Sequence, residues 1–113
     1  MCNQNTLKII LNKVCRYSRD VFGEKLCAVK LYGSYARGDF DDESDIDIMV
    51  VVDLAASELS KYEEQFSNYS FDLALEYRTL PSVFLQDKAT YENYKNTYPF
   101  FMNIEKEGVD LVA

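Results

Sequence analysis

The run over residues 45–53 constrains the fold most strongly, because Ile and Val recur through it and favour a β-strand. Successive side chains of a strand point to opposite faces, so one face is expected to be wholly apolar: Ile46, Ile48, Val50 and Val52. The other face begins with Asp45 and Asp47 and continues with Met49 and Val51. The run therefore places two carboxylates at the start of a buried strand, where like charges repel and solvation is poor.

Further elements follow from the periodicity of apolar residues along the rest of the chain. Helical spacing predicts helices over residues 6–22, 54–68 and 87–96, and Pro99 and Gly108 mark the start and end of a fourth. Alternation and short apolar runs predict strands over residues 26–32, 71–77, 82–85 and 109–112. The order of these elements predicts a single small α/β (α+β) domain over residues 1–113, with a mixed β-sheet flanked by helices.

The composition excludes several kinds of chemistry. The chain of 113 residues has no histidine, which excludes Ser-His-Asp and Cys-His catalysis and the common zinc sites. The three cysteines, Cys2, Cys15 and Cys27, lack metal-ligand spacing and are expected to be reduced thiols. A net charge of −7 disfavours a nucleic-acid substrate and suits a basic protein partner or a cation. Without a membrane-spanning run or a signal peptide, a cytoplasmic protein is expected.

Three carboxylates are expected to converge, namely Asp45, Asp47 and Asp72. The first two leave one face of their strand, and Asp72 would lie close to them if the strand over residues 71–77 returns beside it, at the usual spacing of ~4.8 Å. Each pair of charges about 4 Å apart repels by about 4 kcal/mol at an effective dielectric constant of about 20. The acids must therefore take up protons or bind a divalent cation, and all-oxygen ligands favour Mg²⁺ or Mn²⁺. The acids within residues 39–43 are expected to be solvated.

A glycine turn precedes this strand. Gly33 ends the strand over residues 26–32, and Ser34 is a suitable N-cap for a short helical turn that Gly38 ends. The backbone N–H groups at the start of such a turn favour an anion, and Arg37 adds donors that suit phosphate. Next to a pair of metal-binding acids, the turn predicts a site for a nucleoside triphosphate with bound Mg²⁺.

The string GSYARG at residues 33–38, followed by DID at residues 45–47, has ten residues between Ser34 and Asp45. This pattern resembles the signature of the DNA polymerase beta superfamily of nucleotidyltransferases, and in particular its minimal nucleotidyltransferase (MNT) branch. Residues 71–73 and 103–109 are also similar to this branch. The resemblance implies a nucleotidyltransferase-type fold for the chain.

The resemblance also implies a role for each residue of the motif. Gly33 and Ser34 would hold the triphosphate, and Arg37 would contact a phosphate. Asp45 and Asp47 would be catalytic residues that bind both of two Mg²⁺ ions. Asp72 would be the third catalytic carboxylate, on the ion nearest the attacking hydroxyl, with Glu76 on the same expected face as the alternative.

Many small proteins of the MNT branch are antitoxins encoded beside HEPN-domain toxins. The resemblance therefore implies transfer of AMP from ATP to a hydroxyl, expected to be a tyrosine, of a partner HEPN toxin. A chain of this size leaves no room for an acceptor domain, so the partner is expected to supply the acceptor surface. Two alternatives stay open: a non-catalytic module that neutralises a toxin by covering it, and a small-molecule nucleotidyltransferase that resembles aminoglycoside-modifying enzymes. The latter would need a homo-oligomer to build its acceptor pocket.

Overall fold

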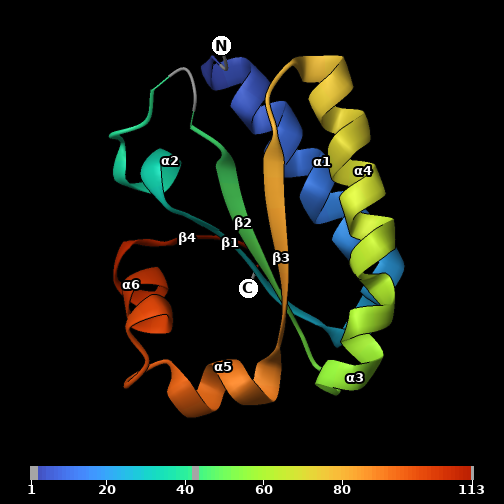
Figure 1. The fold of residues 1–113 in the computed structure, drawn as a ribbon, viewed down its shortest axis with the longest axis vertical. Coiled ribbons are helices and arrows are strands. Elements are labelled where there is room, and N and C mark those ends of the chain that lie inside the picture. Colours follow the sequence, from blue (N-terminus) through green and yellow to red (C-terminus); the bar gives the residue numbers. More distant parts are fainter. Residues whose placement is uncertain (1–2, 42–43, 113) are drawn as a thin grey trace.

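The computed structural model describes residues 3–41 and 44–112, which form one β-sheet with helices on both of its faces (Figure 1). The α-helices are α1 (Gln4–Phe22), α2 (Ser34–Arg37), α3 (Ala56–Leu59), α4 (Glu63–Tyr77), α5 (Lys88–Tyr94) and α6 (Pro99–Glu107). The strands are β1 (Leu26–Tyr32), β2 (Ile46–Val52), β3 (Pro81–Asp87) and β4 (Val109–Val112). Short 3₁₀ turns, η1 (Gly23–Lys25) and η2 (Ser60–Tyr62), follow α1 and α3.

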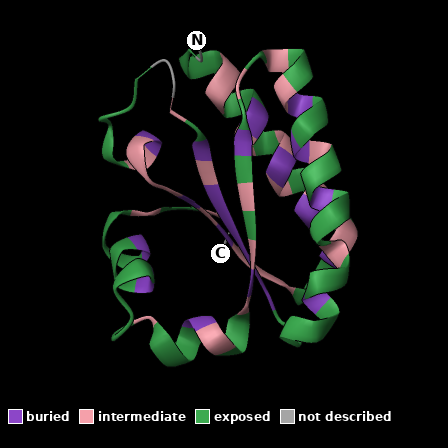
Figure 2. Cartoon of the chain, viewed as in Figure 1, coloured by how far each residue is buried: buried purple, intermediate pink, exposed green. Residues whose placement is uncertain are grey.

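The sheet is mixed, as predicted, with the strand order β3-β2-β1-β4. Strand β1 runs antiparallel to β2 and β4, and β2 runs parallel to β3. Strand β2 is therefore an interior strand, and all of its residues except Asp47 are buried (Figure 2). This burial explains the Ile and Val run, because a strand that is covered on both faces needs apolar side chains on both.

Two apolar clusters lie on opposite faces of the sheet. One joins α1 and α4 to the apolar face of β2, and it includes Ile10, Val14, Ile48, Val50, Phe66 and Leu73. The other joins α5 and α6 to the second face of β2, and its buried residues are Met49, Val51, Tyr91, Phe101 and Ile104. Because Asp47 alternates with Met49 and Val51, its carboxylate lies on the α5 and α6 side of the sheet.

The strand predicted over residues 71–77 is wrong, because these residues form the second half of α4. The alternation of apolar residues there suggested a strand, but the buried residues of α4 are Phe66, Ser70 and Leu73, which are spaced by four and three. Phe71 and Leu75 are 61% and 68% exposed. No glycine or proline interrupts residues 56–80, so the helix continues until its left-handed cap at residue 78.

The other predicted elements agree closely with the structure, except that the helix expected over residues 54–68 is divided among α3, η2 and the start of α4.

The two cysteines within the described residues, Cys15 and Cys27, are free thiols. Among the acids expected to be solvated, Asp39 and Asp41 are exposed. The remaining residues of those two predictions lie outside the described residues: Cys2, Asp42 and Glu43. Within residues 3–41 and 44–112, no helix is long and apolar enough to cross a membrane.

Candidate functional site

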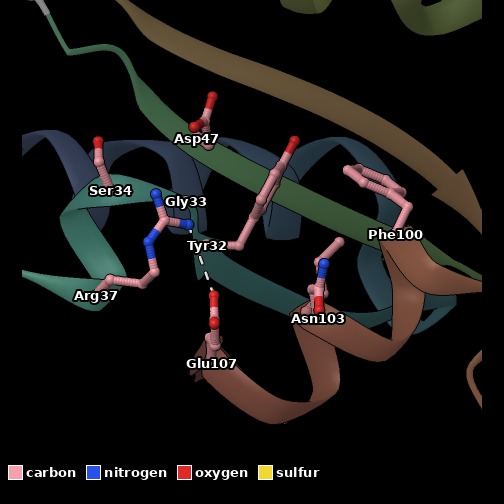
Figure 3. Close-up of a pocket in the computed structure, with 9 residues that line it drawn as sticks. Tyr32, Gly33, Ser34, Arg37, Asp47, Phe100, Asn103 and Glu107 are labelled. Atoms are coloured by element: carbon pink, nitrogen blue, oxygen red, sulfur yellow. Dashed lines mark ion pairs between the residues drawn. The ribbon is translucent and has the colours of Figure 1, made fainter. Parts of the chain in front are cut away.

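A cavity of about 360 Å³ lies beside the start of β2, between α2 and α6 (Figure 3). One wall comes from β1, α2 and β2, and consists of Tyr32, Gly33, Ser34, Arg37 and Asp47. The other wall comes from α6, and consists of Phe100, Asn103, Ile104 and Glu107. The cavity therefore brings the glycine turn, the arginine and one of the paired carboxylates to a single place, as the sequence predicts.

Gly33 allows the turn before α2 to contact the carboxylate of Asp47. Its φ of 74° and ψ of −155° lie in a region that is essentially open to glycine alone. A Cβ atom at this position would overlap Oδ2 of Asp47 and would stand 3.2 Å from its Cγ. Both the backbone conformation and the available space therefore require glycine here.

Helix α2 is a single turn that begins at the edge of the cavity. The carbonyl oxygen of Gly33 accepts hydrogen bonds from the backbone N–H groups of Ala36 and Arg37, each at 3.1 Å. The N-cap is thus Gly33, one residue before the expected Ser34. The first amide groups of a helix have no intrahelical acceptor, and they attract anions. Together with Ser34 and Arg37 on the same wall, this end of the cavity can bind phosphate.

The paired carboxylates differ in their exposure. Asp45 is exposed at the residue before β2, whereas Asp47 is half-buried. Burial raises the pKa of Asp47, the charge of Asp45 raises it further, and Arg37 lowers it. A cation beside both groups would offset the burial and the repulsion together. The donor set therefore fits a divalent cation with oxygen ligands, such as Mg²⁺.

The expectation that Asp72 joins this pair is wrong. Asp72 is exposed on α4, which packs against the opposite face of the sheet from Asp47. It lines a different groove, together with Tyr17 and Tyr69. The alternative, Glu76, lies on the same helix. Both expectations depended on a strand at residues 71–77, which the structure replaces with α4.

The strand that does return beside β2 is β3, and its residue in register with Asp47 is Ser82. Side chains in register on neighbouring strands leave the same face, so Ser82 occupies the place that the third carboxylate was expected to take. Within the described residues, no group of three or more His, Cys, Asp or Glu side chains is arranged to hold a metal ion. Among residues 3–41 and 44–112, Asp45 and Asp47 are therefore not joined by a third carboxylate in a metal-binding arrangement.

Arg37 is held at the rim of the cavity by two carboxylates. Its Nε donates to Oδ2 of Asp39 at 3.1 Å, and its Nη1 lies 3.6 Å from Oε2 of Glu107 (Figure 3). The guanidinium is exposed, so both ion pairs are weak and can be exchanged for a bound phosphate.

Sequence reasoning found residues 103–109 similar to the MNT branch but gave no role in the site to the residues of α6 that line the cavity. Phe101 and Ile104 of α6 are buried in the core, whereas its lining residues Phe100, Asn103 and Glu107 are exposed. Phe100, Asn103 and Glu107 follow a spacing of three and four, which places them on one stripe of the helix. That stripe, next to a buried one, is the signal that could have found them.

A comparison with protein families finds that the nucleotidyltransferase domain model matches residues 7–98. Two proteins of Methanocaldococcus jannaschii are similar in sequence. "Putative protein adenylyltransferase MJ0141" is 41% identical over 46 residues, which are 38% of this chain and 46% of that protein. "Putative protein adenylyltransferase MJ0604" is 33% identical over 82 residues, which are 69% of this chain and 70% of that protein. The first alignment thus spans under half the length of its relative, and the second spans more than two thirds.

Two solved structures share the fold. A mutant of the toxin–antitoxin MntA-HpeT aligns with a TM-score of 0.54 and 20% identity, over 91% of this chain and 73% of that chain. A toxin–antitoxin crystallised with AMP-PNP aligns with a TM-score of 0.54 and 21% identity, over 91% and 73% of the two chains. At this level of identity the likeness shows a common fold.

Proposed function

The chain belongs to the nucleotidyltransferase domain family, and we propose that it transfers AMP from ATP, with Mg²⁺, to a tyrosine hydroxyl of a partner HEPN-type toxin, as the antitoxin of that pair. The observation that carries the proposal is the close approach of Gly33 to the carboxylate of Asp47 in one cavity. It places anion-binding backbone beside a cation-binding acid, which is what a metal-bound triphosphate requires. Relatives named as adenylyltransferases, and a toxin–antitoxin with the same fold, support the choice of substrate and partner.

Each residue of the cavity has a proposed role. Gly33 and Ser34 hold the triphosphate at the start of α2, and Arg37 exchanges its carboxylate partners for a phosphate. Asp45 and Asp47 hold Mg²⁺, for which the family resemblance implies two ions. Bound there, Mg²⁺ would neutralise phosphate charge and lower the pKa of the attacking hydroxyl, which is about 10 for a free tyrosine.

The reaction joins the acceptor oxygen to the α-phosphorus of ATP. That bond forms in line with the breaking bond between the α-phosphorus and the bridging oxygen, so pyrophosphate leaves and the hydroxyl proton passes to solvent. The chain contributes by holding the triphosphate in one orientation, since positioning supplies much of the rate in phosphoryl-type transfers. The acidic chain, with its net charge of −7, suits a basic partner that presents the acceptor.

A second candidate function is supported by one observation. Ser82 stands in register with Asp47, where a third carboxylate was expected. A carboxylate pair that has Ser82, and not an acid, beside it on β3 suits a chain that binds a nucleotide and covers its toxin without transferring AMP. The two functions differ in whether the partner gains mass.

Incubation of the full chain with its partner toxin, ATP and Mg²⁺, followed by intact-mass measurement of the partner, tests the proposal. We expect the partner to gain AMP with the wild-type chain and with Asp72→Asn, which makes the same substitution on the opposite face of the sheet. Asp47→Asn is expected to abolish the gain while retaining the fold. Tight binding of the toxin by the wild-type chain without any mass gain would favour the second function.

A further inference from the structure

Helices α1 and α4 lie side by side on the face of the sheet opposite the cavity (Figure 1). They run antiparallel, because Phe22 at the end of α1 contacts Tyr62 just before α4, and the carbonyl oxygen of Lys13 accepts a hydrogen bond from the hydroxyl of Tyr69. Their inner stripes cover the core. Their outer stripes are exposed, and together they form a surface that we call the α1–α4 face.

Charge is divided between the two helices of this face. Helix α1 carries four basic residues and one acid, whereas α4 carries four acids and no basic residue. The basic residues of α1 are Lys8, Lys13, Arg16 and Arg19, and the acids of α4 are Glu63, Glu64, Asp72 and Glu76. Within the described residues, none of these side chains forms an ion pair. Both sets of charges are therefore available to a partner.

Large apolar side chains lie among these charges. Phe71 and Leu75 are 61% and 68% exposed, and their spacing of four places them on one stripe of α4, away from its buried residues. Ile9 of α1 is 43% exposed. Because the helices are antiparallel and Lys13 contacts Tyr69, Ile9 lies near the level of Leu75. Apolar residues gathered on an exposed face mark an interaction surface.

A second copy of this chain carries the complementary pattern. If two α1–α4 faces meet about a two-fold axis parallel to the helices, each α1 lies on the α4 of the other copy, at the same level. A basic helix then meets an acidic one in both contacts, and the axis produces every contact twice. A two-fold axis in the same plane but perpendicular to the helices would place α1 on α1 and α4 on α4, and these like charges repel. Charge therefore selects the first arrangement.

We propose that the α1–α4 face joins two copies of this chain in a two-fold dimer, with α1 of each copy on α4 of the other. Ile9 then meets Leu75 of the other copy, and Arg19 meets Glu64. By their numbers of residues the helices are about 22 and 28 Å long, and with a width of about 10 Å each they present roughly 500 Å². Specific interfaces bury about 800 Å² per partner, so the dimer is expected to be weak, with a micromolar Kd.

The dimer leaves both cavities open. Each cavity is lined by residues of one chain and lies on the other side of the sheet from α1 and α4, so the two cavities face away from each other. The dimer itself does not depend on the proposed function, but with that function it presents two nucleotide sites to two acceptors at once. It builds no shared acceptor pocket, which the small-molecule nucleotidyltransferase alternative would need.

Sedimentation equilibrium of the full chain tests the dimer, at about 0.15 M salt, where the net charge of −7 is screened beyond about 8 Å. We expect a monomer–dimer equilibrium with a micromolar Kd. One double variant, Arg16→Glu with Arg19→Glu, reverses two charges of α1, and another, Glu64→Arg with Asp72→Arg, reverses two charges of α4. Each alone should weaken the dimer by about tenfold or more. An equimolar mixture of the two should dimerise again, because each reversed helix then faces its opposite on the other copy.

The apolar residues provide a second test. Phe71→Ala with Leu75→Ala should weaken the dimer by about tenfold or more. Met102→Ala replaces an exposed residue of α6, on the other side of the sheet, and should leave the dimer unchanged. Thermal unfolding shows whether each variant keeps its fold.

Three results would overturn the dimer. The first is a wild-type chain that stays monomeric at millimolar concentration. The second is a mixture of the two charge-reversed variants, both folded, that stays as monomeric as either variant alone. The third is a dimer that neither charge reversal weakens, because its interface would then lie on another face of the chain.

Discussion

Replacement of Gly33 by alanine should separate the stability of the chain from its ability to bind a nucleotide. The φ of 74° and ψ of −155° at this residue cost about 1–3 kcal/mol for any residue with a Cβ atom. The new methyl group would also overlap Oδ2 of Asp47, so the carboxylate or the turn must move. We expect a loss of about 1–3 kcal/mol in the free energy of unfolding, which lowers the Tm by about 4 °C or more.

Gly23 provides a matched control for this substitution. Its φ is 56°, but a Cβ atom there would meet nothing within 4 Å. Gly23→Ala therefore carries backbone strain without disturbing Asp47, and it lies at the other end of β1 from the cavity. A comparison of the two variants isolates the contact between Gly33 and the carboxylate.

Urea denaturation and titration with ATP in Mg²⁺ measure the two effects. Both alanine variants should lose stability, but only Gly33→Ala should lose nucleotide binding, by about tenfold or more if one or more phosphate contacts worth about 1.5–3 kcal/mol are displaced. Unchanged ATP affinity in a folded Gly33→Ala variant would show that the glycine has no part in nucleotide binding.

Three further predictions concern single side chains. Burial and the charge of Asp45 raise the pKa of Asp47 above 3.8, so the free energy of unfolding of the apo chain falls as pH rises through that raised pKa. Asp47→Asn removes this loss, and urea denaturation at pH 7 should show that the variant is at least as stable as the wild type. A less stable variant would contradict this prediction. Ser82→Asp adds a charge in register with Asp47 and should lower the free energy of unfolding by up to about 1 kcal/mol in EDTA, a loss that Mg²⁺ should reverse. Thermal unfolding of this variant that does not respond to Mg²⁺ would count against this prediction. Tyr91→Phe removes a hydrogen bond that the Tyr91 hydroxyl donates to Glu105, and urea denaturation should show a free energy of unfolding lower by about 1–2 kcal/mol. A loss below about 0.5 kcal/mol would show that solvent replaces this bond.

The parts of the site that lie close together in the sequence could be predicted from it. Gly33 and Asp47 are joined by one antiparallel pair of strands, and Tyr32 pairs directly with Asp47. The periodicity of residues 45–53 also determines which face carries the acids. Local patterns and one turn were therefore enough to predict that Gly33 and Asp47, the proposed phosphate and cation ends of the cavity, lie together.

The rest of the site depends on packing between distant segments. The alternation of apolar and polar residues over 71–77 fits a strand, but it also fits a helix that buries one residue in seven. The contacts of Leu73 with the core show that the segment is a helix. The position of β3 beside β2, and hence of Ser82 beside Asp47, follows from where α4 ends. The wall from α6 likewise exists only because Phe101 and Ile104 pack on β2 and turn Phe100 and Asn103 toward the cavity.

In the proposed site, one Mg²⁺-bound triphosphate lies between the start of α2 and the acids at the start of β2. A crystal structure of the full chain with AMP-PNP and Mn²⁺ in place of Mg²⁺ tests it most directly, because the anomalous signal of Mn²⁺ locates the ion. We expect that signal beside Asp45 and Asp47, with the phosphates against Gly33 and Ser34. An ion or phosphates located in the groove beside Asp72, on the opposite face of the sheet, would contradict it.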